Sequence, residues 1–290
     1  VRLLSVLFGL LTLPVIYVLG VRMGGVGAGL LAVFIAAAHP MHIQYSQEIR
    51  TYALSWLLAA AALYSFLGLL QKRRHALVAC VVINGLLMMT HVMNVFVIVP
   101  QSLFVFALSR RTLAAWALSH TLILVAVAGW IATAPYEERG DAWMPLPNIS
   151  SIGMMVSWYT GAGGFQVREN VPGLLRLLRP LLQGALVAVY AGAVIHAVLC
   201  LLRRRDVSRG ASHRDLFVLL AFSLVPPAGL GVFSYAVGPM FVARYVGYVF
   251  IPLCVLLAVA VWTARDRRIR AMFMGVVFVL VSAQAWTLVC

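Results

Sequence analysis

Long apolar stretches separated by short charged breaks constrain this chain more than any other feature of its sequence. Of its 290 residues, 63% are hydrophobic, and the mean hydropathy is +0.99. A water-soluble core cannot bury such an apolar fraction, so the composition indicates an integral membrane protein. A helix that crosses a bilayer needs about 20 apolar residues. The pattern therefore predicts one all-α, polytopic transmembrane domain over residues 1–290 with about ten transmembrane helices, at about 3–20, 24–38, 52–70, 76–90, 92–108, 113–134, 173–202, 216–236, 246–264 and 271–290. The second, fourth and fifth stretches are short, which predicts tilt or a partly re-entrant path.

The distribution of basic residues predicts how these helices are oriented. A net charge of +14 first suggests nucleic acid as a partner. The basic residues occur instead in short runs between apolar stretches, whereas a nucleic-acid footprint lies on one solvated face, so nucleic acid is not expected. When successive loops are placed on alternate sides, one side holds 15 of the 22 basic residues, in the loops at Arg22, 71–75, 109–112, 203–215 and 265–270. The positive-inside rule makes that side cytoplasmic. The prediction is a multi-pass protein of the cell membrane with its active face outside.

A polar island at residues 39–52 interrupts the apolar pattern on the predicted outer side. Its Glu48 is the first acidic residue of the chain, and Arg50 follows two positions later. Such charges are costly near lipid and usually face a site or a water-filled cavity. If the island is helical, Tyr45, Glu48 and Tyr52 share one face. That face could hold a phosphate or a sugar hydroxyl.

The segment 135–172 is the longest predicted outer loop. It is rich in proline, glycine and aromatic residues and carries several charges. Long loops of this kind are usually functional or disordered, and the aromatic residues favour an ordered segment at the membrane interface. We expect this loop to cover the cavity and to help select the acceptor, with a solvated loop face as the alternative reading of its acidic residues.

The polar island carries a resemblance to a known enzyme class. It contains His39-Pro40 and then Tyr45-Ser46-Gln47-Glu48-x-Arg50-x-Tyr52, which resembles a motif of GT-C type membrane glycosyltransferases. The nearest branch is the superfamily of dolichyl-phosphate-mannose protein mannosyltransferases and aminoarabinose transferases, in which Ser is usual where His39 stands. Weaker similarities lie at Leu13-Pro14 to Gly20, at Thr90-His91, and at Pro239-Met240-Phe241-Val242-Ala243-Arg244-Tyr245 followed by Pro252.

The resemblance implies a reaction and its partners. These enzymes move a sugar from a polyprenyl-phosphate carrier to a protein, lipid or glycan acceptor at the outer face, usually with inversion. In the family the catalytic base is a carboxylate in the first outer loop, after the first transmembrane helix. This chain resembles the family from about the second helix onward, so we expect the base to lie outside it, and no catalytic residue is assigned. No cofactor is predicted with certainty, and use of a divalent metal stays open.

Six residues are candidates for binding the donor. Arginines at the outer membrane surface could hold the lipid phosphate and stabilise the charge that develops on it, which favours Arg50 and Arg244. Arg176 and Arg179 are weaker candidates, since snorkelling alone explains arginines at the end of a span. Glu48 would orient Arg50 or the donor, or form a structural ion pair. Tyr45 and Tyr52 are the next two candidates, with aromatic anchoring at the membrane interface as the alternative. His91 is the last candidate, with a hydrogen-bonded position in the core as the alternative.

A non-enzymatic membrane protein is the rival interpretation. Charged residues within apolar stretches also suit a transporter or a lipid-binding partner subunit. Transporters often show inverted repeats with polar sites near the midplane of the bilayer, whereas this sequence shows no internal repeat. The identity of the sugar, the acceptor and the oligomeric state do not follow from the sequence.

Overall fold

The computed structural model describes residues 2–133, 144, 146–165, 173–202, 213–264 and 267–289. Every regular element in these ranges is a helix, which confirms the all-α prediction. The α-helices are α1 (Arg2–Gly24), α2 (Val26–Ala37), α3 (Pro40–Gln47), α4 (Tyr52–Leu70), α5 (Ala76–Thr90), α6 (Val95–Ser102), α7 (Arg110–Thr133), α8 (Ile149–Tyr159), α9 (Gly173–Leu202), α10 (His213–Ala236), α11 (Phe250–Trp262) and α12 (Arg267–Val289). Short 3-10 helices are η1 (Val92–Asn94), η2 (Val105–Ala107), η4 (Ala162–Phe165) and η5 (Ala243–Val249).

The number of helices suited to cross a membrane is lower than the ten predicted. Within the described ranges six helical stretches are long and apolar enough, and a seventh is reached if α2 and α3 count as one span bent by 59°. The apolar helices α5, η1 with α6, and the apolar part of α12 are shorter than a bilayer span. The described residues of all ten predicted stretches are nevertheless largely helical. Hydropathy located the apolar segments correctly but overestimated how many are long enough to span.

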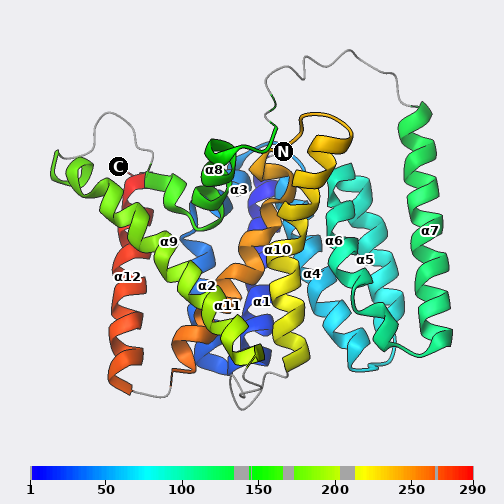
Figure 1. Cartoon of the computed structure of the whole chain (residues 1–290), viewed down its shortest axis with the longest axis horizontal. Helices are drawn as coiled ribbons and strands as arrows, with labels where there is room; N and C mark the ends of the chain where they lie inside the picture. Colours follow the sequence, from blue (N-terminus) through cyan, green and yellow to red (C-terminus); the bar gives the residue numbers. More distant parts are fainter. Residues whose placement is uncertain are drawn as a thin grey trace.

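A close pair of helices forms the centre of the molecule. α1 packs against α2, α3, α4 and α11. A Cβ added at Gly20 would lie 2.7 Å from Gly29 Cα, so only glycine allows the backbones of α1 and α2 to approach this closely. Gly25, with φ of 84°, makes the tight turn between the two helices. The central α11 is largely buried, whereas α7 stands at the edge of the bundle (Figure 1).

The helices place two sets of connections at opposite ends of the bundle (Figure 1). One end carries α3, α8 and η5, and we call it the α3 end. The other carries the turn at 71–75 and the starts of α7, α10 and α12, where the basic residues cluster, and we call it the basic end. The polar island and the basic clusters therefore lie on opposite sides, in agreement with the alternation that the sequence predicted.

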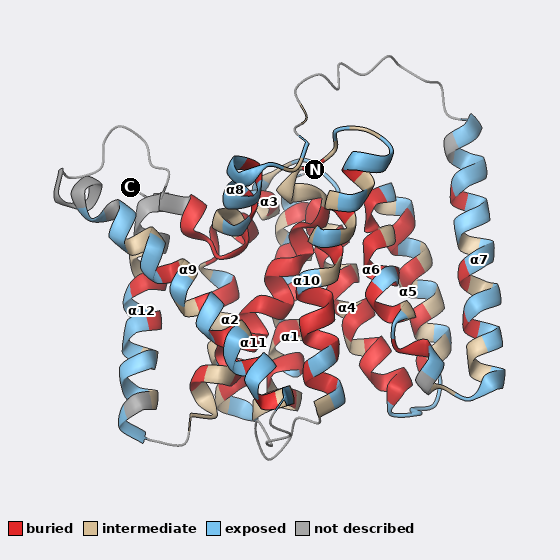
Figure 2. Cartoon of the chain, in the orientation of Figure 1, coloured by how far each residue is buried: buried red, intermediate tan, exposed pale blue. Residues whose placement is uncertain are grey.

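The outer surface of the bundle is apolar. Large exposed hydrophobic side chains lie along α7, α9 and α12, while the buried residues concentrate in α1, α4, α10 and α11 (Figure 2). In water such a surface would be an association hazard, and in a bilayer it is the surface that lipid requires. The chain is a multi-pass membrane protein.

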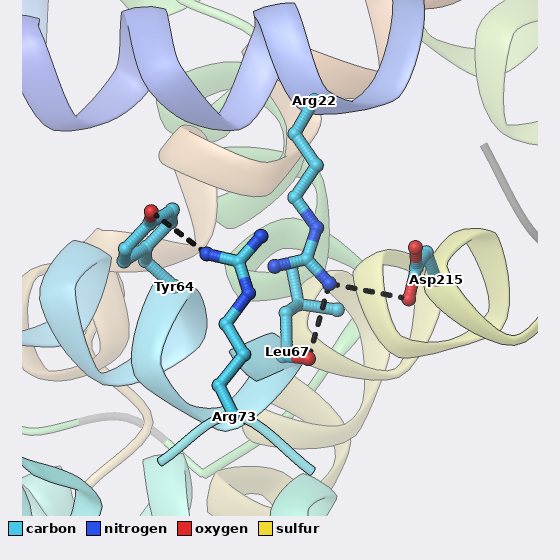
Figure 3. A network of polar contacts seen from close by, with 5 residues as sticks. All are labelled: Arg22, Tyr64, Leu67, Arg73 and Asp215. Atoms are coloured by element: carbon cyan, nitrogen blue, oxygen red, sulfur yellow. Dashed lines mark hydrogen bonds and ion pairs between the residues drawn. The ribbon is translucent and has the colours of Figure 1, made fainter. Parts of the chain in front are cut away.

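Arg22 does not lie in a loop, as the sequence interpretation placed it. α1 continues to Gly24, so Arg22 belongs to its last turn, with a largely buried side chain. Its Nη2 atom lies 3.6 Å from Asp215 Oδ1 and donates to Leu67 O at 3.0 Å (Figure 3). Nearby, Arg73 donates to the Tyr64 hydroxyl at 3.4 Å. This network joins α1, α4 and α10 at the basic end.

Candidate functional site

The polar island is a broken helix, not a continuous one. α3 ends at Gln47, and Glu48 has extended backbone angles before α4 starts at Tyr52. The expectation that Tyr45, Glu48 and Tyr52 share one helical face is therefore wrong. The turn still brings the two tyrosines together, with ring centroids 5.0 Å apart in an edge-to-face contact. Sequence spacing alone could not show this contact, because it depends on the chain reversing its path.

The late segment that the sequence singled out packs directly against the polar island. Trp56 contacts both Tyr45, at 5.2 Å between ring centroids, and Phe250, at 4.9 Å. A Cβ added at Gly247 would lie 2.8 Å from the Trp56 ring and 3.0 Å from Met41 Cε. Glycine at 247 is therefore what lets η5 approach α3 and α4. Residues about 200 positions apart in the sequence meet in one site.

A polar pocket of about 470 Å³ opens at the α3 end. Four of the six candidate residues line it or lie at its rim: Tyr45, Glu48 and Arg50 from the island, and Arg244 from η5. Sequence reasoning missed four further lining residues, the polar Arg2, Gln44 and Gln47 and the apolar Ile49. The motif itself contains Gln47, and Gln44 is one helical turn before Glu48. Arg2 gave no signal, because only the packing of α1 against α3 brings it here.

A weak ion pair holds the carboxylate of this pocket. Arg50 Nε lies 3.9 Å from Glu48 Oε2, and Gln44 donates to Glu48 Oε1 at 3.1 Å. The Arg50 side chain is 57% exposed and that of Glu48 is 32% exposed. Exposed ion pairs at this distance contribute little, roughly 0–1 kcal/mol. An incoming phosphate could therefore take over the Arg50 guanidinium at low cost.

His91 lies beside the pocket on a break between two helices. Its extended backbone ends α5, and its Nδ1 atom accepts a hydrogen bond from Met93 N at 3.1 Å. The His91 ring lies 5.1 Å from that of Tyr245 and 6.1 Å from that of Tyr52. His91 and Tyr52 thus belong to an aromatic cluster behind the pocket, and neither lines the polar cavity itself.

Hydrogen bonds around His91 stabilise the break between α5 and η1. Asn94 Nδ2 donates to Leu87 O at 2.9 Å and to Thr90 Oγ1 at 2.9 Å, and the Thr90 hydroxyl lies 2.8 Å from Ser55 Oγ. These bonds satisfy backbone and side-chain groups that a helix break would otherwise leave unpaired. They also tie the break to α4, which carries Tyr52.

A second pocket, of about 340 Å³, adjoins the first and is largely apolar. It lies between α3, α8 and η5, and α8 contributes Met154, Met155 and Trp158. Tyr45 and Arg244 line both pockets. The site therefore places a polar, cation-rich space and an apolar space on the two sides of one tyrosine and one arginine.

Backbone anchors fix the position of Arg244. The Tyr159 hydroxyl at the end of α8 donates to Ala243 O at 3.0 Å. His39 Nε2 lies 3.2 Å from Tyr159 O, and its ring stacks on Phe250. Burial, with a smaller contribution from Tyr45, raises the pKa of the Tyr159 phenol well above its usual value, so the phenol remains a donor. The His39 position of the motif is structural here.

Part of the predicted loop and two candidate arginines lie outside the described residues. The side chains of Arg176 and Arg179 belong to this part, as do the acidic residues of the segment 135–172. Within that segment α8 is ordered, and Asn148 and Ser151 form a capping box at its start. In the described part of the chain no group of three His, Cys, Asp or Glu residues is placed to hold a metal ion.

Comparison with known proteins covers the part of this site that comes from the N-terminal half of the chain. No curated protein and no solved structure matches the chain. A family model does match, and it covers the polar island and His91 but ends before η5 and Arg244. The resemblance inferred from the polar island is confirmed by this match: over residues 1–136 the chain is similar to the dolichyl-phosphate-mannose-protein mannosyltransferases, a family of GT-C type.

Proposed function

We propose that this protein is a glycosyltransferase that takes a sugar from a polyprenyl-phosphate carrier and transfers it, with inversion, to an acceptor at the outer face of the membrane. The family match over residues 1–136 supports the general class. The observation that carries the proposal is the pair of adjoining pockets that share Tyr45 and Arg244. A lipid-linked sugar has the same two-part chemistry, a polar sugar phosphate joined to an apolar chain.

The three arginines of the polar pocket are placed for different roles. Arg244 stands at the boundary between the pockets, where the phosphate of such a donor must lie. Arg50 and Arg2 line the polar side and would contact the phosphate or the sugar. Positive groups at this position stabilise the negative charge that builds on the leaving phosphate. Tyr45 also lines both pockets.

Glu48 is suited to orienting Arg50 and is not assigned as the base. Both of its carboxylate oxygens are engaged, one by Gln44 and one by Arg50. In the described part of the chain Asp215 is the other carboxylate, and it lies at the basic end in contact with Arg22. The base that activates the acceptor is therefore left unassigned.

Transfer assays with arginine variants test the proposal. Membranes that contain the complete gene product would be given radiolabelled polyprenyl-phosphate sugars. Removing one charge-stabilising group costs about 100-fold in rate, so Arg50→Gln and Arg244→Gln should each lose transfer to about that extent. Arg111→Gln, an exposed arginine at the start of α7, is the matched control and should keep the wild-type rate.

Two outcomes would count against this function. A wild-type rate in Arg244→Gln would remove the phosphate role of the boundary arginine. If the inserted wild-type protein transfers no sugar from any donor of a broad panel, the non-enzymatic alternatives, a transporter or a partner subunit, would take its place.

A further inference from the structure

A further groove, which is wholly apolar, lies toward the basic end, away from the two pockets of the candidate site. It runs between α2, the end of α11 and α12, and has a volume of about 530 Å³. None of its lining residues is charged. One wall of the groove is α12, much of which is exposed (Figure 2) and which carries large exposed apolar side chains such as Met272 and Phe278. The proposed reaction does not use it.

Glycine and aromatic residues give the groove its shape. The Trp262 ring packs on Gly27 so closely that a Cβ there would overlap it. Gly275 leaves the α12 wall open, since among the described residues no heavy atom lies within 4 Å of a Cβ added there. Phe34 and Phe278, which both line the groove, stack on each other with ring centroids 5.4 Å apart and planes within 8°. From Gly27 to Phe34 the wall of α2 is about 10 Å long, at 1.5 Å per residue.

On α12, two arginines lie in line with the residues that form the groove wall. Arg267, Arg270, Met274 and Phe278 are spaced by three or four residues, so they form one stripe along the helix. Met274 and Phe278 line the groove. Arg270 lies over the Trp262 ring at 5.5 Å and donates through Nη1 to Trp262 O at 3.4 Å. Trp262 also lines the groove, so the guanidinium is held at its mouth.

We propose that this groove binds one acyl chain of an anionic phospholipid, whose phosphate is held by Arg270 and Arg267. The apolar wall accepts a chain and rejects charge, while the mouth supplies two cations where a headgroup phosphate must emerge. A guanidinium has five N–H donors, and Trp262 O engages one of them through Nη1, which leaves donors for phosphate oxygens. A zwitterionic phospholipid also carries this phosphate, but the cation of its headgroup offsets the negative charge and weakens the attraction to the two arginines.

Photocrosslinking in membranes tests the site. The protein would be reconstituted with phosphatidylglycerol or phosphatidylcholine that carry the same photoactivatable acyl chain, and the labelled peptides would be mapped by mass spectrometry. We expect phosphatidylglycerol to label the Met274 to Phe278 peptide more strongly than phosphatidylcholine does. Arg270→Gln should lower phosphatidylglycerol labelling roughly fivefold, the effect of one arginine at an anionic surface.

Two glycine variants separate the groove from general lipid contact. Gly275→Leu puts a side chain into the groove and should remove the labelling by both lipids. Gly192→Leu is the matched control, because a Cβ at Gly192 on α9 also meets nothing within 4 Å among the described residues, and it should label like the wild type. Melting temperatures of all variants would verify that they are folded.

Several results would overturn the proposal. Equal labelling by the two lipids would remove the proposed preference for an anionic headgroup. Unchanged labelling in Gly275→Leu would show that the chain lies elsewhere. Stronger labelling of this peptide by a photoactivatable polyprenyl phosphate would assign the groove to the donor, and crosslinks between two copies of the chain would assign it to self-association.

Discussion

At the residue scale, the placement of Arg244 depends on groups that never touch the pocket. Its neighbour Ala243 is held by the Tyr159 hydroxyl, and the Tyr159 carbonyl lies 3.2 Å from His39 Nε2. These contacts connect the entry to α3 with the end of α8 and with η5. A charged side chain is useful for binding phosphate only when its backbone is fixed, because misplacement by about 1 Å can cost up to about 100-fold in rate.

Removal of the Tyr159 hydroxyl should therefore impair the reaction more than the fold. In Tyr159→Phe we expect donor turnover to fall about tenfold, since the anchor at Ala243 is lost and Arg244 shifts. The measurement is the rate of sugar transfer together with the melting temperature. Tyr190→Phe is the control, because the Tyr190 hydroxyl contacts Cys254, away from both pockets. Equal losses of transfer in the two variants would contradict the positioning role.

At the element scale, the site exists because η5 can approach α3 and α4. The approach requires a residue without a Cβ at position 247, where Trp56 and Met41 already fill the space. Three irregular backbone segments meet at this end of the bundle: the turn after Gln47, the break at His91, and η5. Non-helical backbone at membrane depth is tolerated where it is buried or lines a cavity, as it does here.

Replacement of Gly247 by alanine tests this packing. The added Cβ must displace the Trp56 ring, and overpacking of this kind costs about 1–3 kcal/mol. We expect Gly247→Ala to lower the melting temperature of the detergent-solubilised protein and to reduce sugar transfer. Gly129→Ala on α7, where a Cβ meets nothing within 4 Å among the described residues, should leave transfer unchanged and should not lower the melting temperature, because alanine favours a helix over glycine. A Gly247→Ala protein with wild-type melting would contradict the close approach.

At the scale of the whole molecule, one ion pair at the basic end joins the two halves of the chain. Arg22 lies on α1 and Asp215 on α10, and both side chains are largely buried (Figure 3). Removal of one partner leaves the other charge buried without its counter-ion, which costs about 3–5 kcal/mol. Joint replacement of the two by apolar residues avoids that cost.

We expect Asp215→Leu to be strongly destabilised and the double variant Arg22→Met with Asp215→Leu to recover much of the loss. Thermal denaturation in detergent measures both, and a double-mutant cycle isolates the pairwise contribution. If the double variant is less stable than Asp215→Leu alone, the ion pair does not dominate the energetics of this contact.

The orientation of the whole bundle can be tested with single cysteines. The positive-inside rule predicts that the α3 end faces outward. Ile49→Cys, at the exposed rim of the polar pocket, should react with an impermeant maleimide in intact cells, and Arg74→Cys should react only after permeabilisation. The background is a Cys290→Ala chain, and the three other cysteines, Cys80, Cys200 and Cys254, are buried. The reverse labelling pattern would invert the proposed active face.

The sequence by itself determined the class of protein, the positions of its apolar helices and the residues that carry charge at one end. These follow from local composition and hydropathy, because the cost of placing polar groups in lipid acts on each segment separately. The motif at residues 39–52 also indicated the family resemblance that the match over residues 1–136 confirmed.

Only the tertiary structure decided which residues share a pocket. It turned the chain after Gln47, placed Arg2 beside Arg50, moved Arg22 from a presumed loop into a buried ion pair, and set Tyr52 and His91 behind the polar cavity. It also showed that, in the part of the chain that the structure describes, fewer than ten helices are long enough to span. These outcomes depend on helix breaks and on close backbone approach at glycine, which arise between distant segments and leave no periodic signal in the sequence.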